Sequence, residues 1–149
     1  MKKIKLIFAI IILVIGLNSC SKNDETVTPP PPPAKSEFLY AEGAPTGFIL
    51  ASDPIALAAS KEIFGRNGVT EVVKIKLTSL TVGTYSIGVG NEFTYTRPTT
   101  SSPWVAGTGN VIITSNTGTK ITGTFDLNSG TSTLGINEVH GKFSDITIN

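Results

Sequence analysis

The 149-residue chain contains one cysteine, one histidine and one tryptophan, and only 15% of its residues are charged. A single cysteine excludes a disulfide within the chain, and one cysteine with one histidine argues against a zinc site built from these residue types. Twelve basic and eleven acidic residues give a net charge of +1, which offers no electrostatic attraction for nucleic acid. We therefore expect no nucleic-acid partner, no metal site and no cofactor.

The N-terminus has the organisation of an export signal. Residues 1–5 are basic, and residues 6–17 form an uninterrupted apolar run. As a helix this run spans only ~18 Å, whereas the hydrocarbon core of a bilayer is ~30 Å thick. This length favours a cleaved signal peptide over a transmembrane helix.

The only cysteine follows this run directly, in the sequence Leu17-Asn18-Ser19-Cys20. This sequence resembles the lipobox of bacterial lipoproteins, and the polar residues 21–25 resemble the export tag of outer-membrane lipoproteins in Bacteroidota. The resemblance implies removal of residues 1–19 and lipidation of Cys20 with a diacylglycerol and usually an N-acyl chain such as palmitate. The expected location is the outer membrane, with the protein anchored through the lipid on Cys20 and displayed on the surface or facing the periplasm. An ordinary secretory signal followed by a polar tether is the alternative.

Residues 20–35 have the composition of a tether. Five consecutive prolines at positions 29–33 cannot donate backbone hydrogen bonds and favour polyproline II, which extends ~3.1 Å per residue. We expect this segment to hold a single β domain, residues 36–149, away from the lipid.

The remaining chain has the pattern of short strands. Residues 71–80 alternate, with Val73, Ile75 and Leu77 on one face and polar residues on the other. The expected strands are residues 37–41, 47–51, 71–80, 85–89, 92–97, 110–115, 120–127, 133–136 and 139–148. Strands at this spacing, joined by turns of Gly, Asn and Ser, predict an all-β fold: an antiparallel β-sandwich or a small β-barrel. The aromatic residues expected in its core are Phe38, Tyr40, Phe48, Phe64, Phe93, Phe125 and Phe143.

Two segments depart from regular alternation. Residues 54–64 lie between the potential cap Asp53 and Gly65, with Pro54 at the first helical position, which predicts at most one short helix; an irregular strand and loop is the alternative. In the last strand, the apolar residues change parity after Phe143. A β-bulge at residues 144–145 would restore the phase.

Three triplets place a glycine two positions before an aromatic ring, at residues 83–85, 123–125 and 141–143. A glycine beside or opposite a ring leaves space in which the ring can lie. With the Thr-rich strands around them, these triplets make residues 70–149 resemble the β-rich lipoproteins of unknown function found in Bacteroidota. The resemblance implies an all-β lipoprotein and supplies no catalytic residues.

The sequence contains no motif of catalysis. His140, the only histidine, lies opposite the apolar face of its strand, and we expect it to be an exposed strand residue without a catalytic partner. Residues 126–130 space acids and amides as calcium loops do, but a hairpin turn explains them better. No nucleotide-binding loop is present.

The best binding candidates are Trp104, in a polar loop, with Tyr95 and Arg97 on a neighbouring strand. An exposed ring can stack on a sugar or anchor a protein, although the Trp104 ring could instead fold onto the core. The sequence therefore predicts a non-enzymatic envelope lipoprotein with a binding or scaffolding role, whose ligand is a glycan or a protein. The alternative is a hydrolase such as a glycosidase. Its carboxylates, Asp126 with Glu138 or Asp145, would then meet within about 10 Å in a cleft.

Overall fold

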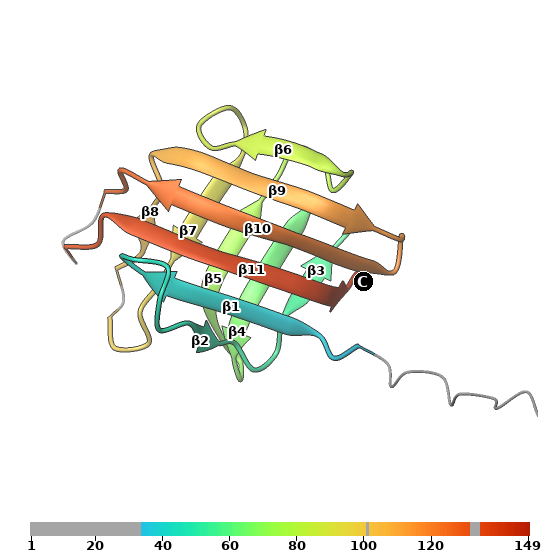
Figure 1. The fold of residues 1–149 in the computed structure, drawn as a ribbon, viewed down its shortest axis with the longest axis horizontal. Coiled ribbons are helices and arrows are strands. Elements are labelled where there is room, and N and C mark those ends of the chain that lie inside the picture. The colour runs from blue at the N-terminus through green and yellow to red at the C-terminus, as the bar shows by residue number, and fades with distance from the viewer. Residues whose placement is uncertain (1–33, 101, 132–134) are drawn as a thin grey trace, which may run out of the picture. The chain divides into compact units, whose positions relative to one another are not determined.

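The computed structural model describes residues 34–100, 102–131 and 135–149, and these residues form eleven β-strands and no helix (Figure 1). The predicted signal peptide, the lipidation site Cys20 and most of the predicted tether lie outside the described residues. None of the described residues belongs to a helix that could cross a membrane.

The strands form two sheets. The six-stranded sheet has the order β2-β1-β11-β10-β9-β6, and the five-stranded sheet has the order β3-β4-β5-β7-β8. The first sheet comprises β1 (Glu37–Glu42), β2 (Ile49–Leu50), β6 (Gly83–Ser86), β9 (Thr108–Asn116), β10 (Lys120–Asn128) and β11 (Glu138–Thr147). The second comprises β3 (Ile55–Leu57), β4 (Glu62–Asn67), β5 (Thr70–Lys76), β7 (Glu92–Tyr95) and β8 (Trp104–Val105).

Every pair of neighbouring strands is antiparallel, and the two sheets face each other as a sandwich (Figure 1). In the described part of the chain, isolated bridges join the margins of the two sheets, between Ala56 and Ile148 and between Val105 and Thr131. The sheets do not close into a barrel. The predicted all-β class is confirmed, and of its two forms the sandwich is the one observed.

The core lies between the sheets and is filled by alternate residues of the long strands. Val73 and Ile75 of β5 belong to this core together with Val111 and Ile113 of β9, and all four are at most 1% exposed. Aromatic rings fill the centre, where the Phe125 ring lies 5.2 Å from that of Phe93 and 5.7 Å from that of Phe38. Burial of this apolar surface is the main force that holds the sheets together.

Phe48 does not lie in the core, contrary to the sequence prediction. Its side chain is 43% exposed, whereas the other six aromatic residues assigned to the core are buried. Phe48 ends the loop from Gly43 to β2, and β2 pairs with β1 over only two residues at the sheet edge. An apolar run at such an edge has no second sheet above it, so it stays in contact with solvent.

The predicted helix over residues 54–64 is absent, and the alternative of an irregular strand and loop is correct. The segment contains β3, a turn in which Lys61 has a φ of 57°, and the start of β4. Ala56 pairs with Ile63, and β4 continues into a ladder with β5. These long-range hydrogen bonds and the burial of Ile63 outweigh the local helix signals.

The bulge predicted in the last strand is present. Ile121 pairs with Ile146 but Gly123 pairs with Phe143, so β11 contains one extra residue at this level. Asp145 takes up the change with a φ of 52°, and its N–H donates to Thr122 Oγ1 at 3.0 Å. The bulge lets both Phe143 and Ile146 enter the core.

Two of the glycine–aromatic triplets interlock across β10 and β11. Gly123 pairs with Phe143, and Phe125 pairs with Gly141. A Cβ at either glycine would overlap the ring of its partner. The glycines therefore provide the space in which these two core rings lie, as the sequence predicts.

Candidate functional site

Trp104 does not provide an exposed binding surface. Its side chain is 0% exposed, its ring lies against Gly130, and its Nε1–H donates to the carbonyl of Ile136 at 2.8 Å. The ring also packs edge-to-face on Phe93 at 6.1 Å. The alternative of a ring folded onto the core is the one observed, because a hydrogen-bond acceptor for the indole lies within the core.

Tyr95 and Arg97 link the two sheets through Glu42. Arg97 Nε lies 2.8 and 3.0 Å from the two carboxylate oxygens of Glu42, and the Tyr95 hydroxyl donates to the same carboxylate. Glu42 ends β1 in one sheet, and Tyr95 ends β7 in the other. The Arg97 hydrogen bonds lower the pKa of Glu42, and burial raises the pKa of Tyr95. Both predicted ligand-binding residues are therefore engaged by an internal carboxylate.

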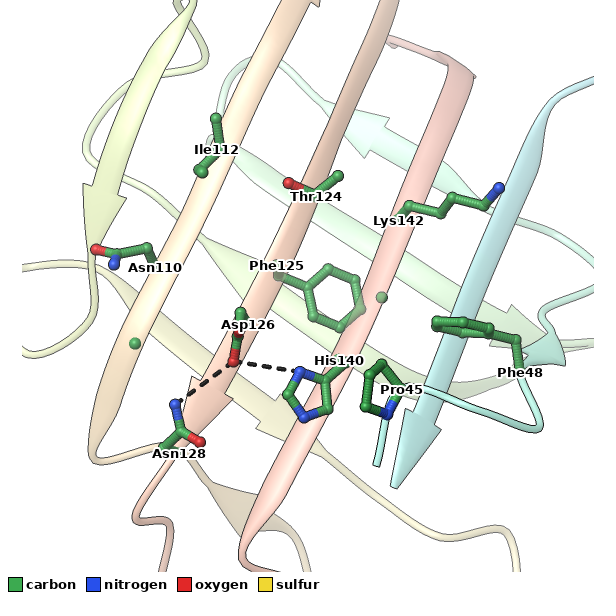
Figure 2. Close-up of a pocket in the computed structure, with 12 residues that line it drawn as sticks. Pro45, Phe48, Asn110, Ile112, Thr124, Phe125, Asp126, Asn128, His140 and Lys142 are labelled. Atoms are coloured by element: carbon green, nitrogen blue, oxygen red, sulfur yellow. Dashed lines mark hydrogen bonds and ion pairs between the residues drawn. The ribbon is translucent and has the colours of Figure 1, made fainter. Parts of the chain in front are cut away.

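A group of polar side chains lies on the outer face of the six-stranded sheet. Strand register aligns Asn110 of β9, Asp126 of β10 and His140 of β11 in one row. Adjacent strands are ~4.8 Å apart, so the row extends across the sheet for ~10 Å. Figure 2 shows these residues on three neighbouring strands. We call them the polar row.

His140 is more enclosed than predicted, since its side chain is only 13% exposed. Its Nδ1 lies 3.2 Å from Asp126 Oδ1, and its Nε2 lies 2.8 Å from Glu138 Oε2. The histidine therefore has two acidic partners that the sequence prediction missed. Because they contact opposite sides of the ring, the three groups do not converge on one point, and within the described part of the chain no cluster of three such residues could hold a metal.

A groove of about 630 Å³ lies over the polar row. Pro45 and Phe48, from the loop between β1 and β2, form one wall, and Figure 2 shows both rings on the side of His140 and Lys142. The lining residues are Pro45, Phe48, Gly109, Asn110, Ile112, Thr124, Phe125, Asp126, Asn128, His140, Gly141 and Lys142. An apolar wall beside hydrogen-bonding groups can bind a small ligand by stacking and by directed hydrogen bonds.

The geometry of the carboxylates bears on hydrolysis. Asp126 and Glu138 both contact His140, which places them within about 10 Å of each other, as a glycosidase pair would be. The imidazole, however, fills the space between them, where a scissile oxygen would have to lie. Glu138 is also absent from the groove lining, and Asp145 lies at the bulge near the other end of β11.

The groove is not apparent from the sequence, for a physical reason. Outward-facing polar residues are expected on any half-exposed strand, and only the register shows that positions 110, 126 and 140 are neighbours. The wall depends on the path of residues 43–48, in which Gly43 and Gly47 each adopt a φ of 70°. In the sequence, the features that could have indicated this wall were Gly43, Gly47 and the aromatic residue Phe48 next to Gly47.

Residues 56–147 match a family model described as Domain of unknown function (DUF6252). The match contains the polar row but neither Cys20 nor the wall formed by Pro45 and Phe48. No curated protein and no solved structure shows a significant match to the chain.

Proposed function

The chain belongs to the DUF6252 family, and we propose that it is a lipid-anchored protein of the cell envelope that binds a glycan or protein ligand without converting it. The groove over the polar row is the observation that carries this proposal. It is open to solvent, and its floor consists of three long strands whose register is unbroken over residues 124–128 of β10. A rigid floor reduces the entropy lost when a ligand binds.

The anchoring part of the proposal is supported by the export signal and by the position of the only cysteine. A diacylglycerol with one further acyl chain on Cys20 would hold the protein firmly at a membrane. The polar residues 21–25 favour the outer membrane and display at the cell surface. A Pro-rich tether suits a binding domain that must reach ligands beyond the lipid.

Replacement of Cys20 tests the anchor. We expect native protein to carry labelled palmitate and to fractionate with the outer membrane, whereas Cys20→Ala is unlabelled and is soluble or uncleaved. Protease treatment of intact cells then distinguishes surface display from a periplasmic location. A Cys20→Ala protein that remains processed and membrane-bound would show that the anchor is wrong.

The absence of turnover is tested on detergent-solubilised full-length protein. We expect polysaccharides and peptides incubated with it to be recovered unchanged, with no new reducing ends or amino termini.

Hydrolysis is the second candidate because Asp126 and Glu138 lie close to a shared histidine. If turnover appears, Asp126→Asn and Glu138→Gln should each abolish it. Turnover of this kind would overturn the non-enzymatic proposal.

A further inference from the structure

We infer that the groove over the polar row binds a neutral carbohydrate segment, with one sugar ring against Phe48 and with hydroxyl groups of the segment on Asp126 and Asn110. This inference rests on the proposed binding function and specifies its ligand.

The wall supplies the stacking surface. Phe48 is 43% exposed, and it lies in the groove lining with the exposed Pro45. The sheet edge leaves the phenyl ring in contact with solvent at the margin of a polar face, where a ligand can cover it. The C–H face of a sugar ring is an apolar surface that can cover such a ring while its hydroxyl groups stay free to form hydrogen bonds.

The polar row supplies groups suited to hydroxyls. The Asp126 side chain is 70% exposed, and its Oδ1 is oriented by His140, so the carboxylate is held in place and still open to ligand. Ser86 Oγ donates to Asn110 Oδ1 at 2.8 Å. Among the described residues the Asn110 side chain makes this one hydrogen bond, which leaves its N–H groups to donate. A hydroxyl can both donate and accept, so one sugar can use the Asp126 acceptor and the Asn110 donors together.

The charges of the groove favour a neutral ligand. Asp126 lies at its centre and Lys142 at its margin, next to the wall (Figure 2). Lys142 is already 3.9 Å from Glu37 across the strand pair, which reduces its attraction for an anion. A polyanion or a nucleic acid would meet the Asp126 carboxylate at the floor. A neutral, polyhydroxylated ligand meets no such repulsion.

The size of the groove favours a short glycan segment over a folded protein. A volume of about 630 Å³ falls within the usual range of ~300–1,000 Å³ for small-molecule sites. A stable protein interface needs ~800 Å² from each partner, which would extend well beyond the polar row. We therefore expect a few linked sugars to fill the groove.

The test uses detergent-solubilised full-length protein and immobilised soluble starch, β-glucan, mannan and xylan. Polygalacturonate serves as the anionic comparison, and a casein digest serves as the peptide comparison. We expect at least one neutral polysaccharide to bind, and Phe48→Ala and Asp126→Asn each to weaken this binding about tenfold.

Val69→Ala and Glu92→Gln are the matched controls. Val69 is 99% exposed and Glu92 is exposed, and both lie in the five-stranded sheet or its turns, away from the groove. These variants should bind as the native protein does. A circular dichroism spectrum for each variant establishes that its fold is retained.

Any other result would overturn the inference, and the pattern of binding would show which part of it is wrong. Binding that Phe48→Ala and Asp126→Asn leave unchanged would place the carbohydrate elsewhere, while the general binding function stands. If peptides bind and glycans do not, and if these variants weaken the peptide binding, the groove is the binding site but its ligand is not a carbohydrate. Failure of every probe would reject the carbohydrate inference, and release of new reducing ends would reject the proposed function itself.

Discussion

Trp104→Ala should destabilise the domain severely, because the indole ring is a part of the core. The side chain is 0% exposed and packs on Phe93, and its N–H pairs with the buried Ile136 carbonyl. Removal of a buried Trp leaves a cavity and costs about 4 kcal/mol. This is a large part of the ~5–15 kcal/mol that usually stabilises a domain.

Trp104→Phe separates the two contributions at this position. The phenyl ring retains much of the packing but cannot donate to the Ile136 carbonyl, so we expect a loss of about 2 kcal/mol. Trp104 is the only tryptophan, and urea unfolding must therefore be followed by far-UV circular dichroism rather than by tryptophan fluorescence. With a urea m-value of about 2 kcal/mol/M, the midpoint should fall by about 2 M for Trp104→Ala and about 1 M for Trp104→Phe.

An exposed, ligand-stacking indole would behave differently. In that case Trp104→Ala would keep the unfolding midpoint of the native protein and would lose ligand affinity. That combination of results would refute the packing described for this residue and restore the alternative of an exposed Trp104 that the sequence left open.

Three other intramolecular contacts also lead to testable effects on stability. Gly141→Ala should lower the free energy of unfolding, measured in urea, by at least about 2 kcal/mol, because its Cβ would overlap the Phe125 ring and a backbone carbonyl. Arg97 lowers the pKa of Glu42, so the stability that this pair provides is complete above the ordinary pKa of 4.5 and is lost as the pH falls through the lower folded value. Urea midpoints between pH 3 and 7 should therefore fall less steeply toward acid in Glu42→Gln, and an unchanged slope would contradict this role. Asn91→Ala should cost about 2 kcal/mol in thermal or urea unfolding, since the 7%-exposed Asn91 side chain bonds two backbone groups at 2.8 and 2.9 Å.

The sequence contains enough information for the fold class and for some local details. Alternation identifies Val73 and Ile75 as inward-facing, and the parity change after Phe143 locates the bulge at residues 144–145, because both signals depend on residues within one strand. The helix prediction over residues 54–64 fails because pairing with β5 is a long-range interaction that no local cap reveals.

The candidate site depends even more on long-range structure. Trp104 lies in a polar stretch, and only the fold shows that Gly130 and the Ile136 carbonyl receive its ring. The polar row likewise joins positions 110 and 140, which become neighbours of Asp126 through strand register. Sequence periodicity predicts which face a residue occupies, but it does not predict which residues share that face as neighbours.

The most direct test of the binding proposal is a crystal structure of the protein with the neutral oligosaccharide that binds it most tightly. We predict an intact sugar in the groove, with one ring against Phe48 and a hydroxyl within ~2.5–3.0 Å of the Asp126 carboxylate. A sugar bound on the outer face of the five-stranded sheet, or a cleaved product beside Asp126, would contradict it.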